Sequence, residues 1–184
     1  MHKCLIFISG PPGAGKSTLT KSLARELKGV VLDKDCIDEP FSPNERGDHY
    51  MKEIQPKSIA ALFNLAQINL ESGNTVFLDA PWTRIMIYDP KWIERSKDLC
   101  KKIRAKLLVV ECFLSEEKLK QRLTKRGFAR DHFRCSNETA WKDFVKRDQI
   151  HKRHPLPHYP INMEETPEIC LQKALDFIRK EITT

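Results

Sequence analysis

Two kinds of hydrophobic pattern alternate along the chain. Short, almost unbroken apolar runs, the first at residues 4–8, are typical of strands buried on both faces of a parallel sheet. Between them lie longer segments whose apolar residues recur every three or four positions, a spacing that predicts helices. The predicted strands are residues 4–8, 30–32, 75–78, 107–114 and part of 159–163. Strands that alternate with helices in this way predict an α/β fold.

The predicted helices fill most of the chain between these strands. The first predicted helix follows the loop that ends near residue 15. The next four cover residues 51–72, 90–103, 116–126 and 136–150, and the last begins at about residue 166. We expect the helix at 51–72 to bury the face that carries Ile54, Ala61, Leu62, Leu65 and Ile68. Proline and glycine between residues 36 and 50 predict a loop, either a segment that closes on a substrate or an ordinary surface connection.

A glycine-rich loop connects the first strand to the first helix. Residues 10–18 fit the pattern G-x-x-x-x-G-K-[ST], in which backbone N–H groups and a helix N-terminus surround a polyphosphate. We expect Lys16 to reach the β- and γ-phosphates and the Ser17 hydroxyl to ligate Mg²⁺. The expected nucleotide-binding residues of the loop are Gly10, Pro11, Pro12, Gly13, Ala14, Gly15, Lys16, Ser17 and Thr18.

Aspartates follow the second and third predicted strands. Residues just past the carboxyl ends of parallel strands face the ligand crevice, and Asp33, Asp35 and Asp79 hold such positions. We expect at least one of Asp33 and Asp35 to bind or activate an acceptor hydroxyl; the alternative is that one or both only cap the turn. Asp79 is the expected second residue of the Mg²⁺ site, acting through water.

Arginines gather in the second half of the chain. Arg122 and Arg126 lie four residues apart on a helix that Gly127 ends, so we expect them to project together and to neutralise charge on a transferring phosphoryl group. Arg130 and Arg134 belong to a segment, about residues 127–155, that we expect to form a lid that excludes water. The alternative for any one of these arginines is a place on a solvated basic helix.

Two further groups of residues leave alternatives open. Trp82 either stacks on a ligand ring or packs in the core, and Arg84 either grips an anionic group or lies on the surface. A second group has spacing that resembles a zinc site, but a predicted helix separates its two pairs, so structural zinc is not favoured. Its members are His132, Cys135, His151 and His154.

Composition narrows the class of protein. The 184 residues are 40% hydrophobic and carry a formal net charge of +7, so we expect one domain over residues 1–184 that binds nucleic acid, anionic lipid or a phosphate-rich ligand. Much of the positive charge falls between residues 118 and 153, where the expected lid accounts for it without nucleic acid. The six scattered cysteines favour free thiols in the cytoplasm, and no apolar stretch is long enough to span a membrane.

The order of these motifs resembles the small P-loop kinases of the adenylate, gluconate and shikimate kinase type. The resemblance is strongest to the AAA_33-like group that includes the kinase domain of phage polynucleotide 5′-kinase. The glycine loop, Asp33-x-Asp35, Asp79 and Arg122-x-x-x-Arg126-Gly127 carry it. The resemblance implies a three-layer P-loop NTPase fold with a five-stranded parallel sheet, helices on both faces and a small Arg-rich lid. It also implies that Asp35 is the general base and that Arg126 stabilises the transition state. We expect Asp33 to assist Asp35. We also expect Arg130 to bind the nucleotide together with Arg126, and Arg122 and Arg130 to help neutralise the charge of the transition state.

The chain departs from this family's pattern at the acceptor side. Asp38 stands where the polynucleotide kinase has an arginine for the substrate's 3′-phosphate, and an acid there is expected to repel phosphate. The Gly-Gly-Gly segment of the shikimate kinases is also missing. We therefore expect a kinase that uses ATP and Mg²⁺ to phosphorylate a hydroxyl of a small molecule, with no protein partner required. The alternatives are a polynucleotide 5′-hydroxyl kinase and an ATP-dependent switch.

Overall fold

The computed structural model describes residues 3–42 and 47–183, with every side chain in these ranges except that of Arg130. Residues 43–46, within the predicted loop, lie outside the described part. Five parallel strands form one sheet in the order β2-β3-β1-β4-β5, which confirms the predicted sheet. They are β1 (Cys4–Ser9), β2 (Val30–Asp33), β3 (Val76–Asp79), β4 (Lys106–Phe113) and β5 (Tyr159–Asn162).

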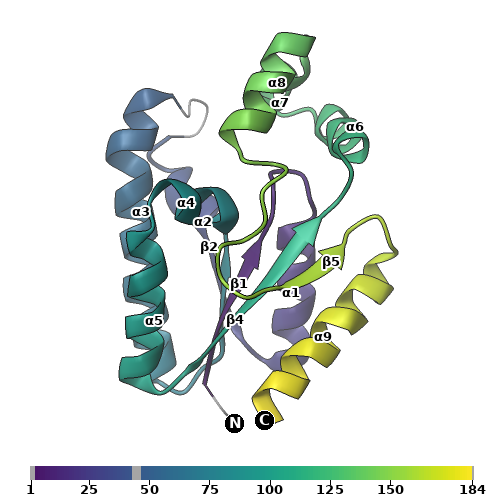
Figure 1. Ribbon diagram of the computed structural model, residues 1–184. Helices are drawn as coiled ribbons and strands as arrows, with labels where there is room; N and C mark the ends of the chain where they lie inside the picture. Colours follow the sequence, from purple (N-terminus) through teal and green to yellow (C-terminus); the bar gives the residue numbers. More distant parts are fainter. Residues whose placement is uncertain (1–2, 43–46, 184) are drawn as a thin grey trace.

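Helices cover both faces of the sheet, so the predicted three-layer fold is confirmed (Figure 1). Strand β1 serves both layers: Leu5 and Phe7 belong to the core on one face, whereas Ile6 and Ile8 belong to the core on the other. This double burial explains the unbroken apolar run. On the first face lie α3 (Gln55–Glu71), α4 (Trp82–Tyr88) and α5 (Lys91–Ile103), and on the second lie α1 (Lys16–Leu27) and α9 (Pro167–Thr183).

A third group of helices lies beyond the carboxyl ends of the strands (Figure 1). It consists of α6 (Glu116–Arg126), α7 (Ala129–Cys135) and α8 (Glu138–Arg147), which share a small core of their own. Buried Trp141 and Phe144 of α8 pack there on Leu119 and Leu123 of α6. This separate core lets the group stand over the sheet as a unit.

The buried face of α3 differs from the predicted face. Leu65 is 41% exposed and Ile68 60% exposed, whereas Ile59 and Phe63 are buried. Both sets of residues satisfy helical spacing, and the larger apolar area of Phe63 favours the face that buries it. Phe63 stacks on Trp92, with ring centroids 5.4 Å apart.

Trp82 belongs to the same aromatic core. Its ring is fully buried, lies 4.7 Å from the Phe7 ring between centroids, and donates its indole N–H to the carbonyl of Leu78 at 2.9 Å. It therefore packs in the core, and the alternative in which it stacks on a ligand is wrong.

Short helices account for the missed elements. The predicted loop at 36–50 is in part helical, with α2 (Lys34–Asp38) before the gap and the π-helical turn Tyr50–Ile54 after it. Helix α4 follows β3 directly, and α7 precedes α8, which begins at Glu138 instead of residue 136. Helices of five to seven residues have little periodicity and depend on tertiary contacts for stability. No helix within residues 3–42 and 47–183 has the length and apolar character needed to cross a membrane.

Candidate functional site

The glycine loop lies between β4 and α6. A Cβ atom on Gly10 would overlap the carbonyl oxygen of Cys112, and one on Gly13, whose φ is +84°, would lie 2.7 Å from Leu123 Cδ2. Glycine is therefore required at both positions, because the chain bends into conformations that other residues rarely adopt and because its neighbours leave no room. Lys16 Nζ donates to the carbonyl of Pro11 at 3.0 Å and so folds back over the loop.

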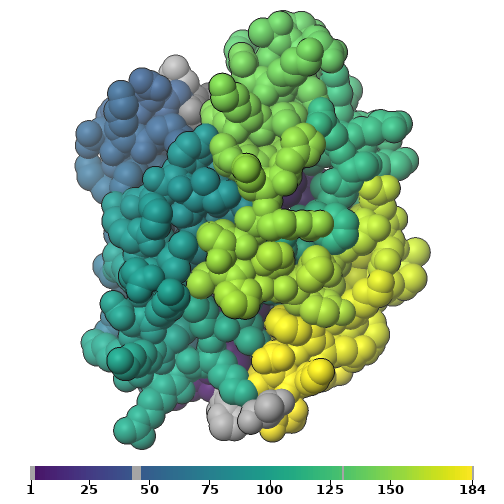
Figure 2. Space-filling view, viewed as in Figure 1, coloured from purple at the N-terminus to yellow at the C-terminus, as the bar shows by residue number. Residues whose placement is uncertain are grey.

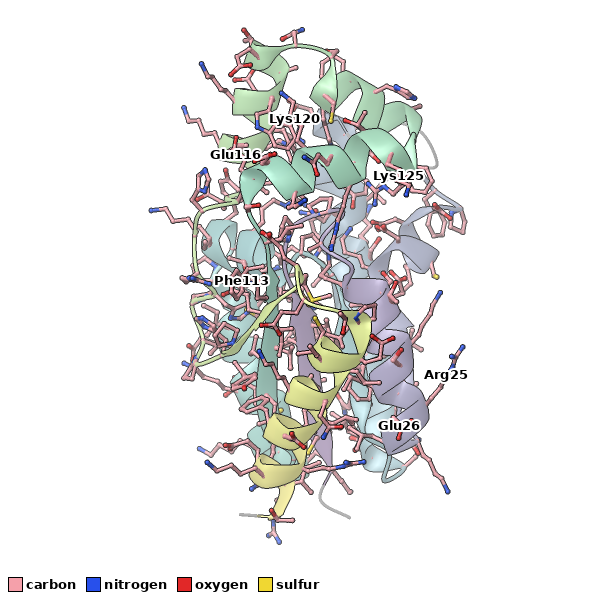
Figure 3. All side chains as sticks on the ribbon, turned by 90° about the vertical axis from the view of Figure 1, so that its right-hand side faces the viewer. Arg25, Glu26, Phe113, Glu116, Lys120 and Lys125 are labelled. Atoms are coloured by element: carbon pink, nitrogen blue, oxygen red, sulfur yellow. The ribbon has the colours of Figure 1, made fainter. Side chains whose placement is uncertain are left out.

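Helix α6 lies across the end of the sheet above the first turn of α1. Figure 3 shows this arrangement, with Glu116 and Lys125 on α6 and with Arg25 and Glu26 toward the far end of α1. The contacts of Gly13 with α6 place the loop directly beneath this helix. Groups carried by the end of α6 are thereby brought to the phosphate-binding loop.

The carboxylates come together as the sequence predicts. Asp33 and Asp79 are register partners on neighbouring strands, and Asp33 caps α2 by accepting a hydrogen bond from the backbone N–H of Asp35 at 2.8 Å. The cap fixes Asp35 in the first turn of α2. Burial, and then the charge of Asp79, raise the pKa of Asp33 above its usual range. Asp33 is therefore both a cap and a member of the acidic cluster.

Asp79 has the properties expected of a magnesium ligand. It is 3% exposed, and its Oδ2 has no hydrogen-bond partner among the described residues. Burial raises the pKa of Asp79, while Lys16 and a hydrogen bond from Ser17 oppose the rise. Mg²⁺ prefers carboxylate and hydroxyl oxygens and keeps several of its waters, so a buried carboxylate oxygen beside a serine hydroxyl fits this cation.

One pocket joins these groups. It has a volume of about 290 Å³ and lies between the glycine loop, the ends of β2 and β3, and two arginines from the helices above. Its lining includes Pro12, Gly13, Gly15, Lys16, Ser17, Thr18, Asp33, Asp35, Asp79, Arg126 and Arg134. The loop, the acids and the arginines, which lie far apart in the sequence, thus face one space.

Arg126 is held by a residue that the sequence analysis missed. Its Nε and one terminal nitrogen donate to the two oxygens of Asp131 at 2.7 and 2.8 Å, and Arg134 donates to the same carboxylate at 3.2 Å. Asp131 is fully buried. An acid five residues after an arginine, across a glycine that ends a helix, is the signal that would have identified this pair. The expected role of Arg130 concerns a side chain outside the described part.

Arg122 does not share the pocket of Arg126, although their spacing predicts that they project together. Its two terminal nitrogens donate to the carbonyls of Ala14 at 3.2 Å and Met163 at 2.6 Å. It lines a separate cavity of about 210 Å³ between α1 and the start of α9. Because its donors are engaged by backbone oxygens, Arg122 joins α6 to the glycine loop and to the segment after β5.

The residues considered for zinc have other partners in part. His151 Nε2 lies 3.0 Å from a carboxylate oxygen of Glu116, and His154 accepts a hydrogen bond from the backbone N–H of Leu156. Among residues 3–42 and 47–183, no three or more His, Cys, Asp or Glu side chains gather so as to hold a metal ion by themselves. A metal ion in this chain would therefore depend on additional ligands such as water or phosphate.

The sequence profile of the AAA_33 family, described as an AAA domain, matches residues 5–149. A shikimate kinase of Corynebacterium efficiens is 26% identical over 103 residues, which cover 52% of this chain and 61% of that protein. The matched stretches of the curated relatives cover 44% to 61% of their own lengths, so the chain spans about half of each.

Solved structures share the fold. A sugar kinase from Janibacter sp. HTCC2649 has a TM-score of 0.69 at 14% identity, with 96% of this chain and 95% of that chain covered. The APS kinase of Mycobacterium tuberculosis, solved with AMPPNP and APS, has a TM-score of 0.68 at 14% identity, with 97% and 98% covered. Likeness at this level of identity concerns the fold alone.

Proposed function

Because the chain belongs to the AAA_33 family of AAA domains, we propose that it is a kinase that transfers the γ-phosphoryl group of ATP to a hydroxyl of a small molecule. The observation that carries this proposal is the single pocket that Lys16, Asp35 and Arg126 line together. These residue types match the three tasks of phosphoryl transfer, which are to hold phosphate, to accept the hydroxyl proton and to neutralise developing charge. The kinases among its relatives and structural neighbours support the same reaction class.

Each part of the site has a defined task in this proposal. The loop N–H groups and Lys16 hold the phosphates, and Asp35 accepts the proton of the attacking hydroxyl. Ser17 and Asp79 would hold Mg²⁺, which supplies positive charge at the phosphate oxygens. Arg126, oriented by Asp131, neutralises charge on the transferring group.

Helices α7 and α8 are the lid in this proposal, within the expected segment 127–155. Asp131 of α7 is paired with Arg126 of α6, and the small core joins α8 to α6, so this segment is tied to α6 and hence to the loop. A segment in this place excludes water, which would otherwise take the phosphoryl group.

The structure changes the argument about a polynucleotide acceptor. Asp38 is fully buried, and both Lys34 and the Tyr50 hydroxyl donate to its carboxylate. Its charge is therefore compensated inside the protein, and the repulsion of a substrate phosphate expected from this residue does not follow. A small molecule remains the acceptor in our proposal, because the relatives and structural neighbours named above are shikimate, sugar and APS kinases.

The experiment follows transfer of labelled γ-phosphate from ATP in the presence of Mg²⁺. The acceptors are a panel of small hydroxylated metabolites, nucleosides and 5′-hydroxyl oligonucleotides, and wild type is compared with Asp35→Asn. The control is Asp98→Asn, which makes the same change on the exposed surface of α5. We expect transfer to a small molecule, lost in Asp35→Asn and kept in the control.

Two other outcomes would contradict the proposal. Transfer to oligonucleotides alone, with a steep loss at higher salt, would identify a polynucleotide kinase. Equal release of phosphate to water by wild type and Asp35→Asn, with no acceptor phosphorylated, would favour a nucleotide-dependent switch.

A further inference from the structure

The helix that carries Asp35 is too short to hold its own position. Helix α2 spans only Lys34–Asp38, five residues, and Asp35 lies in its first turn. An isolated helix of this length is unstable in water, so contacts with the rest of the chain must fix its orientation. A general base has to lie within hydrogen-bond reach of the proton that it accepts. The residues that hold α2 therefore decide whether Asp35 is in place for transfer.

The beginning of α2 is attached to the sheet. Asp33, the last residue of β2, accepts a hydrogen bond from the backbone N–H of Asp35 at 2.8 Å. Within the helix, the backbone N–H of Glu39 donates to the carbonyl of Asp35 at 2.9 Å. These bonds place the first turn at the end of the strand. A second attachment at the far end is needed to fix the direction in which the helix runs.

A buried cluster of Lys34, Asp38 and Tyr50 provides this second attachment. The Tyr50 hydroxyl accepts a hydrogen bond from Lys34 Nζ and donates one to the Asp38 carboxylate at 2.6 Å, and Lys34 Nζ also donates to that carboxylate. All three residues are at most 3% exposed. Hydrogen bonds to ionised groups are stronger than neutral ones, and burial strengthens them further. The first and the last residue of α2 thus contact one tyrosine hydroxyl.

Tyr50 begins the π-helical turn that leads into α3, and this turn is itself held by a buried arginine. The backbone N–H of Gln55 donates to the carbonyl of Tyr50, and Oε1 of the Gln55 side chain accepts from a terminal nitrogen of Arg84 at 2.6 Å. π-Helical turns are rare and occur frequently at functional sites. Tyr50 is therefore joined to Arg84 of α4 through a single residue.

Arg84 also reaches the segment that follows α8. It is 8% exposed, which excludes the surface position that the sequence allowed, and it lies 3.7 Å from Oδ1 of Asp148, which is 7% exposed. In Figure 2, α4 (teal) lies between the N-terminal end of α3 (blue) and the yellow-green segment that follows α8. Helix α4 follows β3, which ends at Asp79. Tyr50 is thereby fixed relative to the edge of the sheet that carries Asp79.

We propose that Tyr50 is a positioning residue for phosphoryl transfer. Through Asp38 and Lys34, its hydroxyl sets the orientation of α2 and with it the place of the Asp35 carboxylate. Among the described residues, Asp35 lines the phosphate pocket and Tyr50 does not, so the tyrosine acts through the helix. This inference rests on the proposed kinase function and adds the residues that hold its base in place.

The test uses Tyr50→Phe, which removes the hydroxyl and keeps the ring. The control Tyr159→Phe removes a hydroxyl from β5, where the ring stacks on Phe177. The first readout is exchange of backbone amide protons with deuterium, followed by NMR. We expect the amides of Asp35 and Glu39 to exchange at least tenfold faster in Tyr50→Phe and at the wild-type rate in the control. Amides in the last turn of α9, which opens without breaking the Tyr50 contacts, should exchange at the wild-type rate in both variants.

The second readout is a double-mutant cycle with the base. In transfer of labelled phosphate to the acceptor found with the panel, Tyr50→Phe should lower kcat about tenfold and leave KM for ATP unchanged. In the Asp35→Asn background the same change should alter kcat less than about twofold, because a base that has been removed cannot be misplaced. A residue that only stabilised the fold would not distinguish the two backgrounds.

Two results would overturn the inference. A similar fall in kcat in both backgrounds would show that Tyr50 acts independently of Asp35. Wild-type exchange at Asp35 and Glu39 in Tyr50→Phe would show that the hydroxyl does not hold α2. Thermal melting checks that each variant is folded, and Asp38→Asn, which weakens the same cluster, replaces Tyr50→Phe with the same expectations if the latter is not.

The wild-type reaction separates this inference from the proposed function. If wild type transfers phosphate and Tyr50→Phe has the same kcat, the inference fails and the kinase proposal stands. If wild type transfers phosphate to no acceptor, the kinase proposal fails, and the inference that depends on it fails as well.

Discussion

Replacement of Asp131 by asparagine tests whether the orientation of Arg126 matters for phosphoryl transfer. The carboxylate is fully buried and accepts both hydrogen bonds of Arg126 and one from Arg134. Asparagine keeps one acceptor oxygen but presents an amide N–H₂ to the guanidinium where the second oxygen was. Arg126 then loses its bidentate partner and gains freedom to turn away from the phosphate pocket.

The expected magnitude follows from these contacts. A hydrogen bond to a charged group contributes about 1.5–3 kcal/mol, and the lower half of this range applies because the Arg126 side chain is 30% exposed. A loss of about 2 kcal/mol in the transition state corresponds to about a 30-fold fall in kcat. Binding of ATP depends mainly on the glycine loop, so KM for ATP should change little.

The assay is steady-state transfer of labelled phosphate from ATP to the acceptor found with the panel. Asp143→Asn, an exposed position on α8, is the matched control and should have wild-type kcat. Asp131→Glu keeps the charge and should recover part of the lost rate. If Asp131→Asn melts at a lower temperature but retains wild-type kcat, Asp131 only supports the fold and the reasoning is refuted.

Three further predictions concern the loop, the metal site and the fold. Gly13→Ala should destabilise the protein by about 1–3 kcal/mol more than Gly73→Ala, because both glycines have positive φ but only Gly13 faces a neighbour, Leu123; urea unfolding measures the difference. Asp79→Asn should raise the melting temperature in EDTA, because it removes a buried carboxylate oxygen without a hydrogen-bond partner. The same variant should raise the Mg²⁺ concentration needed for half-maximal transfer at least tenfold, and an unchanged Mg²⁺ dependence would exclude Asp79 from the metal site. Burial lowers the pKa of His154 to about 4, so as the pH falls the histidine is protonated in the unfolded chain before it is protonated in the folded protein, and stability decreases between about pH 6.5 and pH 4. Urea unfolding at several pH values should show that the free energy of unfolding falls by about 2–3 kcal/mol over this range, and that it falls less in His154→Gln.

Much of the fold could be predicted because local sequence patterns indicate its strands, its helices and the glycine loop. The apolar runs identify the parallel strands, since residues buried on both faces must all be hydrophobic. The glycine loop could be recognised from the sequence, because its backbone conformation depends on residues within the same short segment. The proximity of the aspartates at the ends of β2 and β3 could be predicted because parallel strands end at one edge of the sheet.

The sequence was less informative wherever several local solutions were equally good. Two faces of α3 had helical spacing, and only packing against Trp92 and the sheet selected the face with Phe63. Arg122 and Arg126 have the spacing of neighbours, yet the carbonyls of Ala14 and Met163 hold one of them in a different cavity. These choices depend on atoms that are distant in the sequence.

By itself, then, the sequence determined where the strands lie along the chain, the phosphate-binding loop and the acidic edge of the sheet. Only the tertiary structure decided that Asp131 orients Arg126, that Trp82 lies in the core, and that Tyr50 contacts Asp38 of α2. The physical reason is range. Backbone conformation follows from near neighbours, whereas the partners of a side chain depend on how distant elements pack together. Glu111 contacts Thr83, which is 28 residues away in the sequence, and Arg122 contacts Ala14, which is 108 residues away.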